Sequence, residues 1–211
     1  PAGIPANSVV NRVISSTQIE INNITTTEIS PDWRSVCYGN STYVAVSSGY
    51  TNVAATSTDG VTWTKRTLPF IADWNSVTYG ATSALFVAVA SNGVYGVNYC
   101  ATSADGITWT QRAMPTLMSY TSVATNGTSF VAVGSTSAAA ATTIGAYSAD
   151  GITWAATTMS SQVWNAVSYG GGRYVAVGTG TVTNYDADGA GTWSVGATVP
   201  NVTNTALAYN G

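Results

Sequence analysis

The chain has 211 residues and a net charge of −3, and only 7% of its residues are charged. Its six basic residues are dispersed, which argues against nucleic acid as a partner, and the absence of histidine excludes histidine-dependent triads. The longest apolar run, Leu85–Ala90, is too short to span a bilayer, so we expect no membrane insertion.

Residues 1–30 do not share the pattern of the rest of the chain. Val9–Ile14 and Gln18–Ile24 have the composition of two short strands around a polar turn, which predicts a β-hairpin. Thr25–Ser30 is polar and is followed by Pro31, so we expect a connector there. The sequence therefore predicts an N-terminal hairpin and connector segment, 1–30, before a second region, 31–211.

The second region alternates two repeated phrases. The first is W-N-S-V-T-Y-G at Trp74, followed by a turn and an apolar run, with counterparts starting at Trp33, Tyr120 and Trp164. The second is S-A-D-G-I-T-W, with copies at Ser57–Trp63, Ser103–Trp109, Ser148–Trp154 and, more loosely, Asp186–Trp193. A period of roughly 40 to 46 residues with four strand-like segments per unit predicts a β-propeller with one four-stranded antiparallel blade per unit.

The expected repeats cover 33–72, 73–119, 120–163 and 164–203, and Asn204–Gly211 matches the first strand of a fifth unit. Two explanations compete for that last strand. Either the protein continues past Gly211 or a partner supplies the remaining edge, or the N-terminal hairpin completes a fifth blade and closes the ring. Closure removes exposed sheet edges. The expected fold is all-β: four repeats plus the first strand of a fifth, preceded by a short β-hairpin segment.

The repeated residues have physical roles that the pattern predicts. Asp-Gly forms hairpin turns, because Gly accepts positive φ and the Asp carboxylate accepts backbone N–H groups. The Trp of each phrase is expected to pack between neighbouring blades, and the V-A-V runs suit strands buried on both faces. Asp32 and Asp73 precede equivalent tryptophans and are predicted to cap loops. Lys65, Arg66 and Arg112 follow the Trp and are expected on a solvated rim.

The two cysteines, Cys37 and Cys100, stand where other repeats carry small residues at strand positions. We expect free, buried thiols, with a disulfide as the alternative. Two cysteines without histidine do not make a structural zinc site, and we expect no cofactor or metal. The Asp186–Asp188 phrase is interpreted as a hairpin turn, with calcium contact as the alternative.

The S-x-D-G-x-T-W phrases resemble Asp-box repeats, also called bacterial neuraminidase repeats, over 33–211. The usual pattern has one more residue between Asp and Gly. The cadence is similar to sialidase-like propellers of bacterial and phage-encoded proteins, and that resemblance implies that the Asp turns are structural and lie away from the central pocket. Gly3–Asn23 resembles short β modules of phage virion and bacterial surface proteins.

A sialidase-type site, as the resemblance implies it, would need three arginines, a Tyr–Glu pair and an acid/base Asp. The chain has no glutamate after Glu28, and Arg66 and Arg112 occupy equivalent repeat positions. We therefore expect no enzyme activity. Binding is expected on the variable loops, Ser91–Tyr99 and Ser135–Ala146. Tyr95 and Tyr99 are the candidate contacts with a sugar or a partner protein, and local packing beneath the loop is the alternative.

The leading hypothesis is a noncatalytic structural or adhesion protein of a virion, such as a phage tail or capsid appendage. Its partners would be other virion or surface proteins or a host-surface glycan, within a homo-oligomeric or larger assembly. The alternatives are a secreted or cell-surface bacterial propeller that binds carbohydrate and, less favoured, a sialidase-like hydrolase. An intracellular scaffold resembling photosystem II assembly propellers is disfavoured, because the sequence shows no basic surface.

Overall fold

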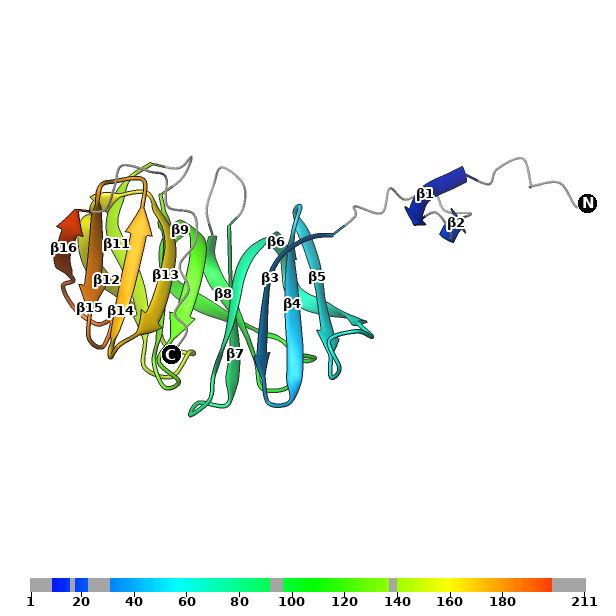
Figure 1. The fold of residues 1–211 in the computed structure, drawn as a ribbon, viewed down its shortest axis with the longest axis horizontal. Coiled ribbons are helices and arrows are strands. Elements are labelled where there is room, and N and C mark those ends of the chain that lie inside the picture. Colours follow the sequence, from blue (N-terminus) through cyan, green and yellow to red (C-terminus); the bar gives the residue numbers. More distant parts are fainter. Residues whose placement is uncertain (1–8, 16–17, 23–30, 92–96, 137–139, 199–211) are drawn as a thin grey trace, which may run out of the picture. The chain divides into compact units, whose positions relative to one another are not determined.

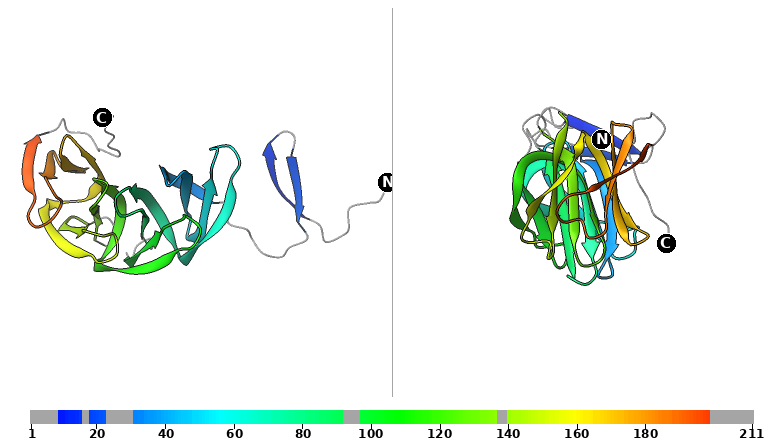
Figure 2. Two further views of the ribbon diagram at one scale, coloured as in Figure 1. Left: turned by 90° about the horizontal axis from the view of Figure 1, so that it is seen from below. Right: turned by 90° about the vertical axis from the view of Figure 1, so that its left-hand side faces the viewer.

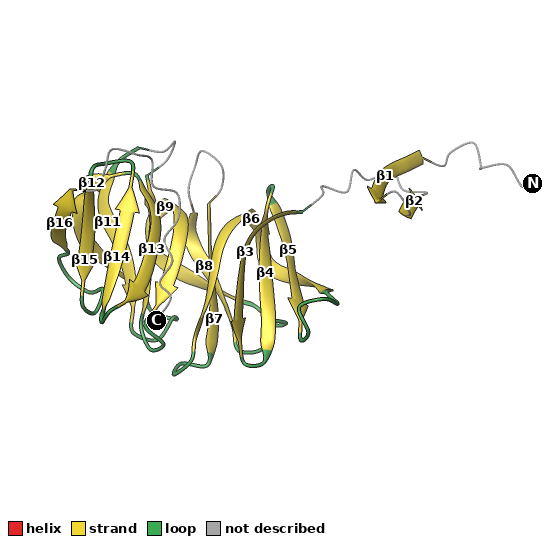
Figure 3. Ribbon diagram, viewed as in Figure 1, coloured by secondary structure: helices red, strands yellow, loops and turns green. Residues whose placement is uncertain are grey.

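The fold is drawn in Figure 1 from a computed structural model that describes residues 9–15, 18–22, 31–91, 97–136 and 140–198. The chain divides into two compact units, Pro1–Ser30 and Pro31–Gly211. Every described element is a β-strand, as Figure 3 shows, so the all-β prediction is confirmed. No helix long and apolar enough to cross a bilayer occurs among the described residues. The expected fifth-unit strand, 204–211, lies outside them.

The first unit contains an antiparallel hairpin of β1 (Val9–Ser15) and β2 (Gln18–Asn22). Its register pairs Val10 with Ile21 and Val13 with Ile19. Alternating apolar and polar residues and the short polar turn favour this pairing. The first strand ends one residue later than the sequence predicts, and the second ends two residues earlier.

The second unit contains four antiparallel four-stranded ladders in chain order, which we call sheets 1 to 4. Sheet 1 comprises β3 (Asp32–Gly39), β4 (Thr42–Ser48), β5 (Thr51–Ser57) and the first part of β6 (Thr64–Gly80). Sheet 2 comprises the rest of β6, β7 (Leu85–Ser91), β8 (Val97–Ser103) and the first part of β9 (Thr110–Thr125). Sheet 3 comprises the rest of β9, β10 (Phe130–Ser135), β11 (Thr142–Ser148) and β12 (Ala155–Gln162). Sheet 4 comprises β13 (Trp164–Gly170), β14 (Arg173–Gly178), β15 (Val182–Asp186) and β16 (Ser194–Thr198).

The long strands β6 and β9 each belong to two sheets. In β6, Thr67 pairs with Val53 of sheet 1, whereas Trp74 pairs with Ala90 of sheet 2. The pairing is interrupted after Thr67, and Pro69 lies in this interruption, where a missing N–H breaks no ladder bond. Hydrogen bonding is therefore continuous from β3 to β12 while the strands turn from one sheet into the next.

Consecutive sheets pack face to face and follow one another in chain order, as Figure 2 shows for the second unit. We call the face that carries the corner tryptophan of a sheet its front face, and the opposite face, with the two valines of the second strand, its back face. The back face of each sheet packs on the front face of the next. The three interfaces are formed by Val44 and Val46 against Trp74, Phe86 and Trp109; by Val87 and Val89 against Tyr120, Phe130 and Trp154; and by Val131 and Val133 against Trp164, Tyr174 and Trp193.

The V-A-V pattern produces this stacking directly. In β7, Phe86 and Ala88 join the interface with sheet 1, while Val87 and Val89 join the interface with sheet 3. All four are fully buried, so the predicted burial on both faces is confirmed. Alanine on the front face lets the preceding sheet approach closely, and each buried valine or phenylalanine contributes roughly 1.5–3 kcal/mol.

Three details of the strands differ from the sequence-based expectation. The predicted loops Ser91–Tyr99 and Ser135–Ala146 are shorter, because Val97 pairs with Met118 and Thr142 pairs with Gln162 at the beginnings of β8 and β11. Ladder pairing extends these strands beyond the part with strand-like sequence. The two aspartates that were predicted to cap loops also differ from each other. Asp73 accepts the N–H groups of Gly49 (2.9 Å) and Tyr50 (2.8 Å) in the β4–β5 turn. Asp32 instead forms an ion pair with Arg34 at 2.9 Å.

Candidate functional site

The turn after the third strand has the same construction in sheets 1 to 3. Asp59 Oδ1 accepts hydrogen bonds from the Ser57 hydroxyl at 2.8 Å and from the backbone N–H groups of Val61 at 2.8 Å and Thr62 at 2.7 Å. The equivalent carboxylates repeat these bonds at 2.8 to 3.0 Å; they are Asp105 and Asp150. The repeated aspartates therefore act as acceptors that hold the corner of each sheet closed.

The glycine and tryptophan of each turn are joined by a further bond. Gly106 has a φ of +74°, which only glycine adopts without strain. Its carbonyl accepts the indole N–H of Trp109 at 3.0 Å. The bond fixes the indole against the back face of the preceding sheet, where Trp109 is buried with Val44 and Val46. The corner and the sheet interface are thus built as one structure.

Hydrogen bonding keeps these carboxyl groups ionised. The Thr108 N–H lowers the pKa of Asp105, and the Thr62 N–H lowers that of Asp59. Burial alone would raise the pKa of Asp150. The hydrogen bonds from the backbone N–H groups of Thr153 and Ile152 and from the Ser148 hydroxyl together outweigh burial, so the pKa is lowered. A carboxylate that stays ionised at neutral pH is a poor general acid.

The corner of sheet 4 uses two carboxylates in place of a hydroxyl and a carboxylate. Asp186 Oδ1 accepts the N–H groups of Asp188 (3.0 Å) and Gly189 (2.8 Å), as Ser57 Oγ does in sheet 1. Burial and the adjacent Asp188 raise the pKa of Asp186, whereas the Ala190 N–H lowers the pKa of Asp188. No group of three or more metal-ligating side chains occurs among the described residues.

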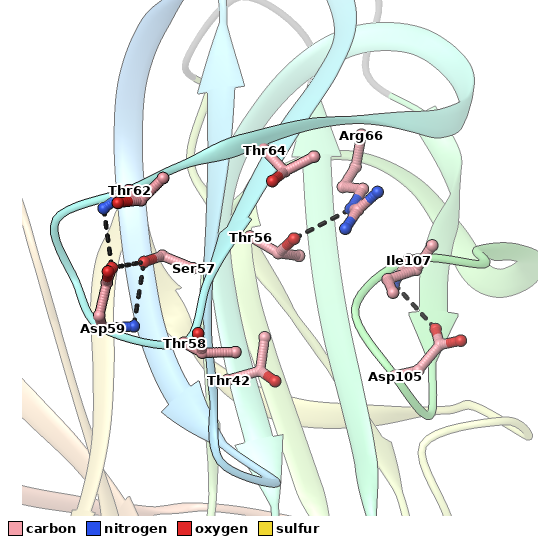
Figure 4. A pocket seen from close by; sticks show the side chains of 10 residues that line it. All are labelled: Thr42, Thr56, Ser57, Thr58, Asp59, Thr62, Thr64, Arg66, Asp105 and Ile107. Atoms are coloured by element: carbon pink, nitrogen blue, oxygen red, sulfur yellow. Dashed lines mark hydrogen bonds between the residues drawn. The ribbon is translucent and has the colours of Figure 1, made fainter.

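A pocket of about 400 Å³ lies between the corners of sheets 1 and 2, as Figure 4 shows. Threonine hydroxyls and charged side chains line it, including Asp59, Arg66 and Asp105. The Arg66 guanidinium donates through Nε to Thr56 Oγ1 at 2.9 Å, and Arg112 repeats this bond to Thr102 at 3.1 Å. The pocket offers polar contacts from carboxylates that already accept backbone bonds.

Of the two tyrosines predicted to contact a ligand or partner, one lies among the described residues. Tyr95 lies outside the described residues. Tyr99 lies in β8 rather than in a loop, and its side chain is 39% exposed. Its ring makes an edge contact with Phe70 at 5.9 Å between centroids, and Phe70 packs on Trp74 at 4.7 Å. Tyr99 is thus the outer, partly exposed ring of an aromatic series that continues into the interface between sheets 1 and 2.

The front face of sheet 1 carries a hydrophobic surface that sequence reasoning missed. Trp33, Val36, Ala45, Ala55 and Trp63 line a second cavity of about 400 Å³. The sequence contains a signal for it, since these residues belong to the first of the repeats in the second unit. We call these five residues the open front face.

The two cysteines are free. Cys100 is fully buried and Cys37 partly buried. Burial raises the pKa of each thiol to about 12. Both therefore stay protonated at neutral pH and are unreactive as nucleophiles, which agrees with the free-thiol expectation.

Comparison with known proteins shows the fold. No family model matches the sequence, and no curated protein matches it significantly. Among solved structures, a catalytically inactive variant of virginiamycin B lyase from Staphylococcus aureus with quinupristin matches 90% of this chain with a TM-score of 0.68 at 10% identity. A selenomethionine-substituted form of that lyase matches 82% of the chain with a TM-score of 0.63 at 9% identity.

A third match is YCF48 bound to D1 peptide, with a TM-score of 0.52 at 13% identity over 85% of this chain. The chain spans 63%, 58% and 56% of the three matched chains, in that order. At these identities the likeness concerns the fold alone. The chain is an all-β antiparallel protein whose fold matches that of seven-bladed β-propellers over most of its length.

Proposed function

We propose that this chain is a noncatalytic propeller module of a virion, such as a phage tail or capsid appendage, used for assembly or host-surface attachment. The observation that supports the noncatalytic part most directly is the state of the repeated carboxylates. Asp59, Asp105 and Asp150 each accept one hydroxyl and two backbone hydrogen bonds through one oxygen. Residues committed in this way to turn geometry are architectural.

The arginines support the same proposal. Arg66 and Arg112 bind threonines at equivalent positions, Arg34 pairs with Asp32, and the Arg173 guanidinium lies 5.2 Å from the centre of the Tyr185 ring. A carboxylate-binding cluster of the sialidase type requires arginines that converge on one point. Arg34 and Arg66 lie in sheet 1, Arg112 in sheet 2 and Arg173 in sheet 4, and each has its own partner.

We also infer that the four sheets are propeller blades of the Asp-box type. The corner bonds support this inference, since a shortened Ser-x-Asp-Gly phrase produces the same closed turn in three sheets. The virion location rests on the resemblance of Gly3–Asn23 to short β modules of phage virion and bacterial surface proteins and on the low share of charged residues.

The matched proteins illustrate two uses of this fold. The lyase variant is inactive through replacement of a histidine, and the present chain contains none. The YCF48 structure holds a peptide partner. Both observations favour binding over catalysis for this chain.

Immunogold electron microscopy tests the virion assignment. An antiserum raised against residues 31–211 is applied to purified particles and to cell envelopes from the source of the protein. We expect label at regular positions on the particles. Label on the envelopes alone would refute the virion assignment in favour of a surface protein.

A hydrolase assay tests the noncatalytic assignment independently. We expect turnover of a fluorogenic sialoside to equal that of the buffer. Turnover above buffer that is lost in Arg173→Ala would contradict the proposal and establish a hydrolase.

Carbohydrate binding by a surface propeller is the second candidate, and the half-open ring of Tyr99 favours it, since aromatic faces pack on sugars. A glycan array with the intact chain tests it. Specific binding that is lost in Tyr99→Ala and kept in Tyr50→Ala, which removes another exposed tyrosine, would support this candidate.

A further inference from the structure

The pocket of about 400 Å³ between the corners of sheets 1 and 2 has its walls on two sheets that pack on each other. One wall is the back face of sheet 1, because Thr56 pairs with Val44 and with Thr64, and residues that pair across a ladder share a face. The other wall is the corner of sheet 2, which contributes Asp105 and Ile107. The pocket therefore belongs to an internal interface of the second unit.

One repeat position explains why this interface is hollow at its corner. Thr42 begins β4 as Leu85 begins β7, so the two hold equivalent positions. Between sheets 2 and 3, Leu85 reaches the next corner, where its Cδ2 atom would lie 3.0 Å from a Cβ placed on Gly151. At Gly106, the equivalent corner of sheet 2, none of the three nearest atoms belongs to Thr42. The shorter side chain thus leaves space and places a hydroxyl group on the wall.

The charged groups around this space do not neutralise one another. In Figure 4, threonines lie between the corner of Asp59 on one side and Arg66 and Asp105 on the other. Within the described part of the chain, no ion pair joins Arg66 to either carboxylate. Arg66 uses its Nε atom for Thr56, and Asp105 uses its Oδ1 atom for the corner bonds. The guanidinium Nη groups and the Asp105 Oδ2 atom remain for a bound molecule.

This combination of groups favours a neutral molecule that is rich in hydroxyl groups. An anion would meet two ionised carboxylates, Asp59 and Asp105, and a cation would meet Arg66. A sugar hydroxyl can donate to a carboxylate and accept from a guanidinium, and bonds to charged groups are the stronger ones. The threonine methyl groups and Ile107 give the C–H groups of a sugar an apolar contact.

The walls of the pocket are fixed by hydrogen bonds. Asn40, in the β3–β4 turn, donates through Nδ2 to the carbonyl of Ala104 at 3.3 Å and so joins sheet 1 to the corner of sheet 2. Asp105 closes that corner, and the bond to Thr56 at 2.9 Å holds the Arg66 side chain. A site that is formed in advance loses less free energy to ordering when it binds.

We propose that the pocket between the corners of sheets 1 and 2 binds a neutral sugar unit of a glycan, through Thr42, Arg66 and Asp105. The volume lies within the range of roughly 300–1,000 Å³ that small-molecule sites have. The proposal rests on the host-attachment part of the proposed function, which supplies the glycan. It concerns a different site from Tyr99, which does not line this pocket.

An NMR titration of the full 211-residue chain, labelled with ¹⁵N, tests the proposal. The probes are the neutral methyl glycosides of glucose, galactose, mannose, rhamnose and N-acetylglucosamine, each raised to about 10 mM, which detects a Kd near 1 mM. We expect at least one of them to shift the amide signals of Thr42, Asp105 and Ile107. Glucuronate, which adds a carboxylate, is expected to bind at least about tenfold more weakly.

Three variants assign the binding to the pocket. Thr42→Leu copies the residue that the chain itself has between sheets 2 and 3, and Arg66→Gln removes the guanidinium. Each is expected to weaken binding of the responding glycoside at least about tenfold. Arg112→Gln is the matched control, because it loses the equivalent bond to Thr102 outside the pocket, and it is expected to bind like the parent chain. Circular dichroism establishes that the three variants are folded.

The results that would overturn the proposal differ from those that bear on the proposed function. Absence of shifts with all five glycosides would overturn it and leave the virion assignment to immunogold labelling. Shifts around Tyr99 that survive Thr42→Leu would also overturn it, in favour of the tyrosine site. Equal losses in Arg66→Gln and Arg112→Gln would show that these arginines only support the sheets.

Discussion

At the scale of single residues, one sequence phrase combines a turn and a packing element. Asp105 closes the corner, Gly106 provides the positive φ, and Trp109 bonds back to the glycine carbonyl while its ring enters the interface. The same side-chain bond recurs at Trp63, yet this side chain is 41% exposed. The local structure of the phrase is therefore constant, and its contribution to stability depends on which sheet stands in front of it.

The two tryptophans provide a matched pair. We expect Trp109→Ala to lower the free energy of unfolding by about 3–5 kcal/mol, because it removes a buried indole and leaves a cavity. Trp63→Ala is expected to cost far less, since 41% of that side chain is already exposed. Urea unfolding measures both. Equal losses for the two variants would contradict the packing described here.

Acid sensitivity follows from the lowered pKa of Asp105. A carboxyl group with a folded-state pKa below its unfolded value of about 3.9 contributes stability that is present above that value and lost as pH falls through the folded pKa. We expect the chain to lose stability below about pH 4, and Asp105→Asn to be less stable at neutral pH but less sensitive to acid.

Asp186→Asn is the control for that experiment. Burial raises the pKa of Asp186, so its contribution has the opposite sign and its removal should leave the acid loss intact. Urea midpoints across the pH range compare the three proteins. An acid loss that is identical in the parent chain and in Asp105→Asn would show that the corner bonds do not carry it.

At the scale of elements, the V-A-V strands set the distance between sheets. The valines fill the back face, and the alanines and corner glycines of the next sheet leave room for them. Gly106 and Gly171 allow this packing effect to be distinguished from backbone strain, because both have positive φ. A Cβ on Gly106 would meet Val44 at 2.7 Å, whereas a Cβ on Gly171 would meet nothing within 4 Å.

We therefore expect two sizes of effect from alanine. Gly171→Ala should cost about 1–2 kcal/mol, the penalty of a left-handed residue. Gly106→Ala should cost a further ~1–3 kcal/mol, because the added carbon overpacks the interface. Thermal unfolding of both variants measures the difference. A smaller loss for Gly106→Ala than for Gly171→Ala would mean that the sheets are not as closely spaced as described.

The repeats made the strands, the corner bonds and the burial of V-A-V predictable from sequence. The repeats identify equivalent positions in the chain, and the turn chemistry of the Asp-Gly phrases predicts the local structure at those positions. What they did not predict depends on neighbours: the passage of β6 and β9 from one sheet to the next, the bonds of Asp73 to the turn of the preceding sheet, and the exposure of Trp33 and Trp63. Equivalent residues had been expected to share one environment, whereas sheet 1 is the one described sheet whose front face has no other described sheet packed on it.

At the scale of the whole second unit, the four sheets form a directional stack in which every sheet has a front face and a back face. The three internal interfaces repeat one pairing of indole and glycine with valine. Stacks of this kind gain stability from each neighbour that they add. On the front face of sheet 1, residues of the kind that are buried between the other sheets, such as Trp33 and Trp63, are exposed.

Hydroxyl-radical footprinting with mass spectrometry tests this stacking most directly, since the seven tryptophans report on it residue by residue. We expect rapid oxidation of Trp33 and Trp63 and strong protection of the other five, Trp74, Trp109, Trp154, Trp164 and Trp193. Protection of Trp63 equal to that of Trp109, or rapid oxidation of Trp109 and Trp154, would contradict it.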